Sequence, residues 1–272
     1  MFDYANQLMQ NGFLTASERI EGVNDNMSAS HYHEFYEIYY LEAGERFHLM
    51  DNNLYLMAPG QFIIFEPYQL HHSYGEKNIP FSRLLVYFHK DILSQALLAN
   101  MDGIAGSYQL GSKENAKVYY LLNQIHNEQH LKMPLYQEDM IHLVNQLIIL
   151  LLRNKEKKEM IYQKNKITDI ISYINLNYMN KITLGQLSER FYISQYHLCR
   201  QFKYYTNITM TQYINNTRII HSQKMLLEED RKITDIGCDV GFDSLTHFER
   251  VFKQITGKTP TQYKKQVHEK AT

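Results

Sequence analysis

The sequence Ser194-Gln-Tyr-His-Leu-Cys-Arg-Gln-Phe-Lys203 returns fifty residues later as Ser244-Leu-Thr-His-Phe-Glu-Arg-Val-Phe-Lys253. Serine, histidine, arginine, phenylalanine and lysine recur in register, and the correspondence continues to Thr211-Gln-Tyr213 and Thr261-Gln-Tyr263. Two copies are too few for a solenoid, in which a longer series of stacked repeats builds a continuous core. The segment Ile182–Tyr263 is therefore interpreted as a duplicated module.

Each copy has the pattern of two short helices joined by a tight turn. Thr183 and Ser194 are the expected N-caps of the leading and trailing helices in the first copy, because their side chains can accept hydrogen bonds from the free N–H groups of a first turn. Thr234 and Ser244 are the corresponding caps expected in the second copy. The pattern therefore indicates two helix-turn-helix units.

Glycine and asparagine are expected to end these helices. Gly241 supplies the turn in the second copy, and Asn207 and Gly257 stand at equivalent positions after the two trailing helices, where a left-handed residue can terminate a helix. Apolar residues at helical spacing are expected to be buried. They are Leu184, Leu187, Phe191, Leu198 and Phe202 in the first copy, and Ile236, Val240, Phe248, Phe252 and Ile255 in the second.

The outer faces of the two trailing helices carry the residues that are expected to contact DNA. A helix fits the major groove, and an arginine can bond both O6 and N7 of guanine. Arg200 and Arg250 recur at one position of the duplicated unit, which favours DNA contact over an ordinary solvated role. For His197 and His247, contact with DNA and a simple helix-face role are equally open. The predicted DNA-binding residues are Ser194, Gln195, Tyr196, His197, Cys199, Arg200, Lys203, Ser244, Leu245, Thr246, His247, Arg250 and Lys253.

Between the copies, Thr209–Leu227 is predicted to form one continuous helix. At a rise of about 1.5 Å per residue it spans roughly 25–28 Å. That length suits a strut that holds two recognition helices about one DNA turn apart. Its apolar positions include Tyr213, Ile214, Thr217, Ile220, Met225 and Leu226.

The second copy carries a family signature. Ile236-Gly-Cys-Asp-Val-Gly-Phe242, His247-Phe-Glu-Arg-Val-Phe-Lys253 and Gly257-Lys-Thr-Pro-Thr-Gln-Tyr263 together resemble the AraC/XylS transcription regulators, and the first copy fits the same pattern. Gly237 stands where the family usually has alanine, and Asn207 where it usually has glycine. The resemblance implies a sequence-specific DNA-binding regulator. Its base-facing positions vary within the family, so no target sequence is implied.

Charge is distributed unevenly along the 272 residues. Residues from Met160 onward hold 16 Lys and Arg against 10 Asp and Glu, a net of +6, while the preceding part carries −7, which gives the formal net charge of −1. A basic carboxyl-terminal part suits a polyanionic partner such as double-stranded DNA.

Cys199 and Cys238, far apart and without a CxxC motif, exclude a disulfide scaffold and a zinc–thiolate site.

No membrane or secretory segment is expected. The first residues lack a basic region followed by an apolar core, so a signal peptide is not predicted. The longest apolar run, Leu147–Leu152, is too short to span a bilayer. The expected location is therefore the cytoplasm.

The amino-terminal part has the pattern of short strands broken by turns. Strands are predicted at Phe35–Leu41, Arg46–Met50, Leu54–Met57, Gln61–Glu66 and Ser82–His89. Their spacing suggests a small barrel or sandwich. His31-Tyr-His33, Glu37, Gly44, Pro59-Gly60, Pro67 and His71-His72 resemble the cupin-type sensor domain that precedes the DNA-binding part in many AraC/XylS regulators. The fold class implied is α+β, with a cupin-like β-barrel and flanking helices followed by an all-α domain.

The polar residues of these strands are expected to bind a small effector. His31, His33, Glu37 and His72 (or His71) also offer three imidazoles and one carboxylate, which would suffice for a metal ion. A glycine expected before the first cupin motif is missing, so a polar pocket wall is preferred, and neither a metal nor a cofactor is expected. Aromatic walls with a few charged groups suit a small polar ligand such as a sugar. The predicted effector-binding residues are His31, His33, Glu37, Tyr39, His72, Arg83, Leu85 and Tyr87.

Two helices are predicted between the strands and the DNA-binding part, Asn115–Gln129 and one from Pro134 to about Lys158. The second is unusually apolar, and its face is expected both to pack on the barrel and to make a homodimer contact through residues 115–152. A helix at Ile167–Met179 opens the last domain. The expected domains are 1–155 for effector binding and dimerisation, 156–166 for the linker, and 167–272 for DNA binding.

The function that these features favour is a ligand-responsive transcription regulator without catalytic residues, which contacts RNA polymerase if it activates. Two alternatives remain. One is a metal-binding cupin enzyme or sensor fused to a DNA-binding domain. The other is an architectural DNA-binding protein with little preference between sequences.

Overall fold

The computed structural model of the 272-residue chain describes residues 3–23, 30–50, 53–76, 78–154, 166–228 and 231–271. The chain divides into two compact units, Met1–Gln163 and Lys164–Thr272. Most of the expected linker, 156–166, lies outside the described residues, and α5 begins at its last residue. Each unit is described by itself.

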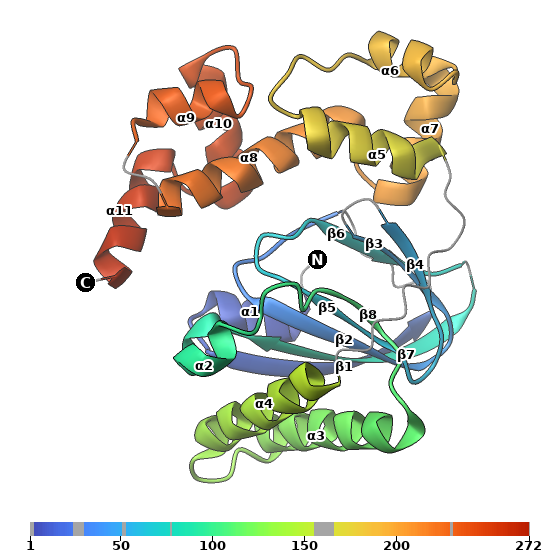
Figure 1. Ribbon diagram of the computed structural model, residues 1–272, viewed down its shortest axis with the longest axis vertical. Helices are drawn as coiled ribbons and strands as arrows, with labels where there is room; N and C mark the ends of the chain where they lie inside the picture. The colour runs from blue at the N-terminus through green and yellow to red at the C-terminus, as the bar shows by residue number, and fades with distance from the viewer. Residues whose placement is uncertain are drawn as a thin grey trace. The chain divides into compact units, whose positions relative to one another are not determined.

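The amino-terminal unit contains two antiparallel sheets (Figure 1). The larger sheet has five strands in the order β1-β7-β2-β5-β8, and the smaller has three in the order β4-β3-β6. The sequence predicted five of these strands, and the structure adds β1, β6 and β8. The strands are β1 (Thr15–Val23), β2 (Tyr36–Ala43), β3 (Arg46–Met50), β4 (Asn53–Met57), β5 (Phe62–Phe65), β6 (His71–Tyr74), β7 (Pro80–Phe88) and β8 (Gly106–Tyr108).

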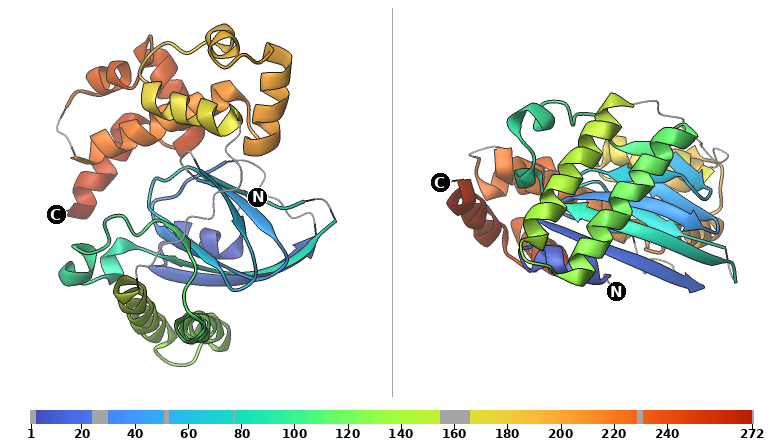
Figure 2. Two further views of the ribbon diagram at one scale, coloured as in Figure 1. Left: turned by 45° about the vertical axis from the view of Figure 1, so that its right-hand side comes forward. Right: turned by 90° about the horizontal axis from the view of Figure 1, so that it is seen from below.

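Side chains alternate between the two faces of the larger sheet, as strand geometry requires. On one face, Ile38 and Tyr40 of β2 join a hydrophobic core with α3 (Ser112–Leu131) and α4 (Tyr136–Arg153). On the other face, Tyr39 and Leu41 belong to a second core that includes residues of both sheets. The two helices lie side by side across the sheet in Figure 2. We call the face that carries Tyr39 the inner face.

The apolar side of α4 is used for packing. Met140, Val144, Leu147, Ile148 and Leu151 are buried in the core between α4, α3 and the larger sheet. The exposed apolar residues of this region lie instead on α3 and in the turn that follows it. They are Tyr119, Tyr120, Leu131, Met133 and Leu135. The smaller elements of the unit are α1 (Tyr4–Gln10), η1 (Lys90–Ile92) and α2 (Gln95–Leu98).

The carboxyl-terminal unit is built from seven helices in the part of the chain that is described. The central helix α8 contacts α5 and α7 at one end and α9, α10 and α11 at the other, and Figure 1 shows it running from one group to the other. The predicted strut is therefore confirmed as a helix. The helices are α5 (Lys166–Asn177), α6 (Leu184–Arg190), α7 (Gln195–Thr206), α8 (Met210–Glu228), α9 (Ile233–Asp239), α10 (Leu245–Thr256) and α11 (Pro260–Ala271).

One predicted cap is wrong. Thr183 caps α6 with a full capping box, in which Gln186 returns the hydrogen bond. In the second copy, however, α9 begins at Ile233, and its N-cap is Lys232, which makes no side-chain capping bond. Thr234 lies inside the first turn, where its hydroxyl donates to the carboxylate of Asp235 at 3.2 Å. The leading helices of the two copies, α6 and α9, are therefore capped differently, although each is followed by a turn at the equivalent position.

The turn after α9 closes against the segment that follows α5. Gly241 has a φ of +94°, and a Cβ atom there would lie 2.6 Å from the backbone oxygen of Met179. Arg218 of α8 fixes the same segment, because it donates from Nε to the carbonyl of Tyr178 at 2.8 Å and from Nη2 to that of Asn180 at 3.0 Å. The segment after α5 is thus held by the second helix-turn-helix turn and by α8 together.

Candidate functional site

The two trailing helices, α7 and α10, begin with the same hydrogen bond. The hydroxyl oxygens of Ser194 and Ser244 each accept from the backbone N–H three residues later, at His197 and His247, with the same distance of 3.3 Å. Both serines are confirmed as N-caps. The duplication seen in the sequence is therefore a duplication of local geometry.

The segments after these helices also match. Thr206 donates to the carbonyls of Phe202 and Ile208 at 2.8 and 3.0 Å, and Thr256 makes the corresponding pair of bonds at the same two distances. Each copy then packs a phenylalanine edge-on against a tyrosine of the next helix. Those ring pairs are Phe202 with Tyr213 at 5.4 Å and Phe252 with Tyr263 at 5.6 Å between centroids.

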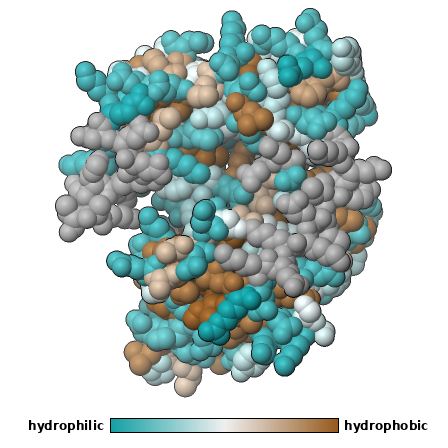
Figure 3. All heavy atoms as spheres, in the orientation of Figure 1, coloured by the Kyte–Doolittle hydropathy of each residue, from teal (hydrophilic) through white to brown (hydrophobic). Residues whose placement is uncertain are grey.

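All thirteen residues predicted to contact DNA are exposed in the carboxyl-terminal unit. Leu198, Phe202, Phe248 and Phe252 form the buried side of the same helices, as predicted, while Ile255 is only partly buried. Hydrophilic side chains cover most of the visible face of this unit in Figure 3. The arrangement leaves a polar face on α7 and on α10, each with an arginine and a lysine one turn apart.

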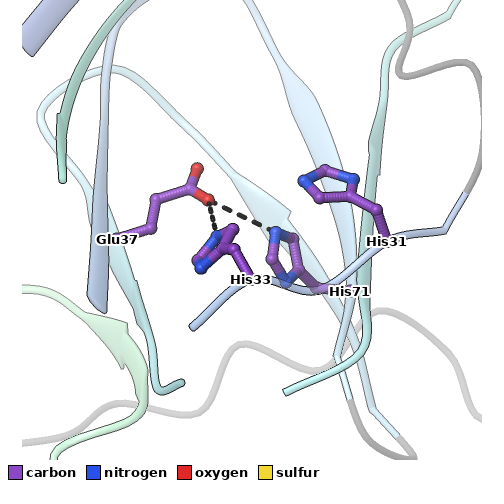
Figure 4. Close-up of side chains that lie close together, drawn as sticks. All are labelled: His31, His33, Glu37 and His71. Carbon is purple, nitrogen blue, oxygen red and sulfur yellow. Dashed lines mark hydrogen bonds and ion pairs between the residues drawn. The ribbon is translucent and has the colours of Figure 1, made fainter. Parts of the chain in front are cut away.

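A second group of candidate residues lies on the inner face of the amino-terminal unit. Glu37 of β2 is fully buried, and its Oε2 atom lies 2.9 Å from Nε2 of His33 and 3.3 Å from Nε2 of His71 (Figure 4). His31 lies beside His71, with ring centroids 4.5 Å apart. We call His31, His33, Glu37 and His71 the histidine–glutamate cluster.

The carboxylate of this cluster is held in its ionised form. Burial by itself raises the pKa of Glu37, but the hydrogen bonds and charges of His33 and His71 outweigh burial and hold that pKa well below the ordinary value. The negative charge is deep inside the unit, so it needs a compensating positive charge close by.

The histidine of β6 that joins the cluster is His71, which was expected from the sequence as the alternative to His72. Successive residues of a strand point to opposite faces, so only one of the two can face Glu37. His72 instead stacks on Tyr74 two residues later, with ring centroids 5.5 Å apart. The sequence carried the relevant signal, which is alternation along the four residues of β6, but that strand was not predicted.

A group of polar side chains farther along the inner face lacks hydrogen-bond partners. Arg83 of β7 is 5 % exposed, and its Nε and Nη1 atoms have no partner among the described residues. The hydroxyl of Tyr39 and both ring nitrogens of His48 are likewise buried without a well-formed hydrogen bond in that part of the chain. Burial lowers the pKa of Arg83, but the Tyr39 hydroxyl nevertheless lies close enough to the guanidinium to raise that pKa. The guanidinium carbon of Arg83 lies 5.4 Å from the centre of the Tyr39 ring, and the His48 ring meets the same tyrosine at 4.3 Å. We call Tyr39, His48 and Arg83 the inner polar group.

Burial sets the protonation state of His48. Burial, and the nearby charge of Arg46, hold the pKa of His48 well below the ordinary value, so its ring is neutral and offers one donor and one acceptor. His48 and Arg46 were not predicted as site residues. They lie at alternate positions of β3, and the predicted strand Arg46–Met50 already implied that they share one face.

The remaining predicted effector residues differ in chemistry. The Tyr87 hydroxyl donates to Oδ2 of Asp3 at 2.8 Å and is therefore already engaged. Leu85 belongs to the hydrophobic core of the inner face. The structure thus brings most of the predicted residues to one face and divides them into the histidine–glutamate cluster, the inner polar group and an apolar remainder.

Comparison with known families identifies both units. The model of the AraC-like ligand binding domain matches residues 16–147, and that of a helix-turn-helix domain matches residues 187–266. The chain is an AraC-type transcriptional regulator. The amino-terminal unit is therefore its ligand-binding domain, and the carboxyl-terminal unit is its DNA-binding domain.

Curated relatives extend over nearly the whole regulator. The HTH-type transcriptional activator RhaR of Escherichia coli (strain K12) is 23% identical over 271 residues, which cover 95% of this chain and 96% of the relative. The protein of the same name from Shigella flexneri matches to the same extent. Both relatives therefore match this regulator across its two units.

Solved structures of similar chains include ToxT from Vibrio cholerae, which is 13% identical to this regulator. The match spans 92% of this regulator and 97% of the ToxT chain, with a TM-score of 0.38. The DNA-binding domain of AdpA, solved in complex with a target DNA, is 18% identical and covers 39% of this regulator and 96% of that chain, with a TM-score of 0.38.

Across the described ranges, none of the helices has the length and apolar content that a bilayer crossing requires.

Proposed function

We propose that this AraC-type regulator recognises a specific DNA sequence with α7 and α10, and that a small polar molecule bound on the inner face of its amino-terminal unit controls this binding. The observation that carries the first part is the repeated geometry of α7 and α10, with the same cap and the same exposed arginine position in both copies. Two equivalent helices joined by one long helix suit two successive major-groove segments.

Arg200 and Arg250 are the proposed base-reading residues. Each is exposed two residues after a buried anchor, Leu198 or Phe248, so its position is fixed by packing while its side chain is free to extend. Lys203 and Lys253, one turn farther on, suit phosphate contacts, which add affinity without sequence information. The other exposed residues of the predicted set complete the two reading faces.

The inner polar group is the proposed effector site. Buried donors and acceptors without partners cost free energy, and a bound ligand that hydrogen-bonds to them removes that cost. Arg83 offers donors, and neutral His48 and the Tyr39 hydroxyl offer both donors and acceptors. Hydroxyl groups can satisfy all of these at once, so the proposed effector is a polyhydroxylated molecule such as a sugar.

A homodimer is proposed through α3 and the turn that follows it. Tyr120, Leu131, Met133 and Leu135 expose 62, 66, 58 and 77 % of their surface, which is unusual for side chains of this kind. The apolar face of α4 is occupied by the core, so the proposed contact uses a smaller part of residues 115–152 than the sequence suggested. Light scattering on Leu131→Glu and Leu135→Glu variants should show monomers, whereas an unchanged dimer would place the contact elsewhere.

Regulation in the direction of activation is proposed because the curated relatives carry the name of activators. It requires a contact with RNA polymerase at the promoter. The expected location is the cytoplasm, which holds the chromosomal DNA in the bacteria that carry these relatives. Neither catalysis nor an architectural role is needed to account for the two domains.

The test combines DNA selection with effector titration. Duplexes bound by the full chain are selected from a random library, and the dissociation constant for the selected site is compared with that for random duplex at matched salt. Arg200→Ala and Arg250→Ala should each weaken binding to the selected site by about 1–3 kcal/mol if each arginine reads a base. Arg153→Ala, an exposed arginine of the other unit, is the control.

The effector part is tested by calorimetry against a panel of sugars, followed by the same DNA titration with the sugar that binds. Arg83→Met should abolish sugar binding while DNA binding without effector is retained. Equal affinity of the chain for selected and random duplex would overturn the DNA part. Failure of every sugar to bind, with specific DNA binding intact, would overturn only the effector part.

A further inference from the structure

The histidine–glutamate cluster is assembled from three separate parts of the amino-terminal unit. His31 and His33 come from the segment before β2, Glu37 from β2 itself, and His71 from β6 (Figure 4). His31 and His71 are tied together by two backbone hydrogen bonds, each 2.9 Å long. One possible ligand atom from each residue lies within 4.8 Å of every other. The backbone therefore fixes four metal-ligating groups around one point.

The hydrogen bonds made by the other ring nitrogens determine which atoms face that point. Nδ1 of His33 lies 2.7 Å from the carbonyl oxygen of Phe35, and Nδ1 of His71 lies 2.9 Å from that of Gln69. A carbonyl oxygen can only accept, so each Nδ1 carries a hydrogen. In the neutral ring Nε2 then bears a lone pair, and both Nε2 atoms point at the same carboxylate oxygen of Glu37.

Two lone pairs and a carboxylate oxygen that face one another repel unless a proton on Nε2 or a metal ion lies among them. The same pattern is the usual second shell of a metal site, in which a ligating histidine donates its remaining N–H to a backbone carbonyl and so fixes its tautomer. The other oxygen of Glu37, Oε1, is buried without a hydrogen-bond partner among the described residues. The cluster thus supplies metal ligands that are already oriented toward one another. The positive charge that would balance the Glu37 carboxylate has to come from such a proton or from a bound cation.

The surroundings of the cluster are aromatic. The Phe35 ring stacks on His33 with centroids 4.4 Å apart, and the Phe65 ring stacks on His71 at 4.0 Å. His33, Glu37 and His71 are buried, while His31 is partly exposed. The cluster therefore has a rigid, low-dielectric side, and His31 is its most exposed member.

We propose that the histidine–glutamate cluster binds one divalent first-row transition-metal ion of the zinc type, with three imidazole nitrogens and one carboxylate oxygen as ligands. This reverses the expectation of no metal drawn from the sequence. It goes beyond the proposed function, since neither DNA recognition nor effector binding requires it. Three nitrogen ligands disfavour magnesium and calcium, which prefer oxygen ligands throughout.

The distances suit such an ion. Bonds of about 2.0–2.2 Å from a metal to nitrogen and oxygen place neighbouring ligand atoms about 3 to 3.5 Å apart. The separations of 2.9 and 3.3 Å between Oε2 of Glu37 and the two Nε2 atoms need only small adjustment. Ligand atoms of the cluster that lie as far apart as 4.8 Å must move closer as the ion binds. The bound ion would join the segment before β2 to β6 of the smaller sheet, and so brace the two sheets at one end of the inner face.

The experiment uses the full chain after removal of metal with a chelator and dialysis. Co²⁺ is titrated and followed by visible absorption, because its ligand-field bands report nitrogen and oxygen coordination, and Zn²⁺ is titrated by calorimetry. One equivalent of each should bind, Zn²⁺ should displace Co²⁺, and the midpoint of thermal unfolding should rise when either is added. Mg²⁺ should produce none of these changes.

Variants locate the site. His31→Ala, at a partly exposed position, and His71→Gln should each weaken Zn²⁺ binding by at least tenfold and abolish the cobalt bands. His72→Gln is the matched control on the adjacent residue of β6, and it should bind as the parent does. Far-ultraviolet circular dichroism checks that every variant is folded. The proposal would be overturned if the parent bound no stoichiometric metal, or if the parent, His31→Ala and His71→Gln bound it equally well. DNA binding is measured separately and does not bear on this proposal.

Discussion

Asn207 and Gly257 occupy the same position in the two helix-turn-helix units, and both adopt the left-handed conformation, with φ values of +54° and +76°. Each donates its backbone N–H over 2.9 Å to the carbonyl of the lysine four residues earlier, Lys203 or Lys253. One backbone requirement is therefore met by two different residues. The chain ends each trailing helix sharply, so that the next helix can begin within three residues.

Substitutions at residue 207 should rank by their tolerance of a positive φ. Asn207→Ala should lower the free energy of unfolding by about 1 kcal/mol, because a Cβ without a compensating polar group is strained in this region. Asn207→Gly should leave stability at or slightly above that of the parent. Chemical denaturation of the three proteins measures the order, and an alanine variant as stable as the glycine variant would contradict it.

Gly241 and Gly257 allow backbone strain to be separated from a steric clash. Both have a positive φ, but a Cβ at Gly241 would lie 2.6 Å from the oxygen of Met179, whereas a Cβ at Gly257 meets nothing within 4 Å. Gly257→Ala should therefore cost about 1–2 kcal/mol, and Gly241→Ala about 1–3 kcal/mol more. Thermal and urea unfolding of the two variants provide the comparison. Equal losses in the free energy of unfolding would contradict this prediction, because they would show that the backbone around Met179 can move aside at little cost.

The helical domain was largely predictable from the sequence. Its caps, buried positions and strut follow from local rules that act within one turn of helix, and the duplication allowed each copy to check the other. The wrong cap illustrates the limit of that check. Thr234 corresponds to Thr183 in the alignment, but Lys232 already occupies the N-cap position, so the helix starts before the threonine.

The sensor interior was less predictable because its geometry depends on pairing between distant strands. The sequence identified His31, His33 and Glu37, but the choice between His71 and His72 required the β3–β6 register, which pairs Met50 with His71. The inner polar group also depends on strand alternation in β2, β3 and β7 at once. Short strands such as β8, which consists only of Gly106, Ser107 and Tyr108, carry too little pattern to be recognised alone.

Gln129 protects the open edge of the larger sheet. Its side-chain oxygen accepts from the backbone N–H of Ser17 at 2.7 Å, and its side-chain nitrogen donates to the carbonyl of Ser17 at 2.5 Å. Gln129→Leu removes both bonds and leaves two buried backbone groups unsatisfied, which should cost about 1–3 kcal/mol. Hydrogen exchange at the Ser17 amide should also accelerate.

The matched control for this change is Gln137→Ala. Gln137 is an exposed glutamine whose side chain, among the described residues, reaches only the hydroxyl of Tyr136 at 3.4 Å. Its loss should change the free energy of unfolding by less than about 0.5 kcal/mol. Equal effects of the two substitutions would contradict the role assigned to Gln129.

His126 should make the stability of the sensor unit depend on pH. Burial, and next the nearby His130, lower the pKa of His126 from 6.5 to about 4. Because the folded pKa lies below the unfolded one, the neutral ring contributes stability above about pH 6.5, and this contribution is lost as the pH falls toward 4. The loss should be on the order of 1–3 kcal/mol.

His126→Gln should flatten the decrease of stability between pH 6.5 and 4, as measured by urea denaturation at closely spaced pH values. His142→Gln, at an exposed position of α4, should retain the slope of the parent. A parent and a His126→Gln variant with parallel pH curves would show that His126 does not titrate in this window.

The central claim is that one chain presents α7 and α10 to two successive major-groove segments on one side of a duplex. Hydroxyl-radical footprinting of the full chain on its selected site tests this most directly. The account predicts, for each bound chain, two protected segments about 10 base pairs apart on the same face of the DNA. A single protected segment for each chain, or two segments on opposite faces, would contradict it.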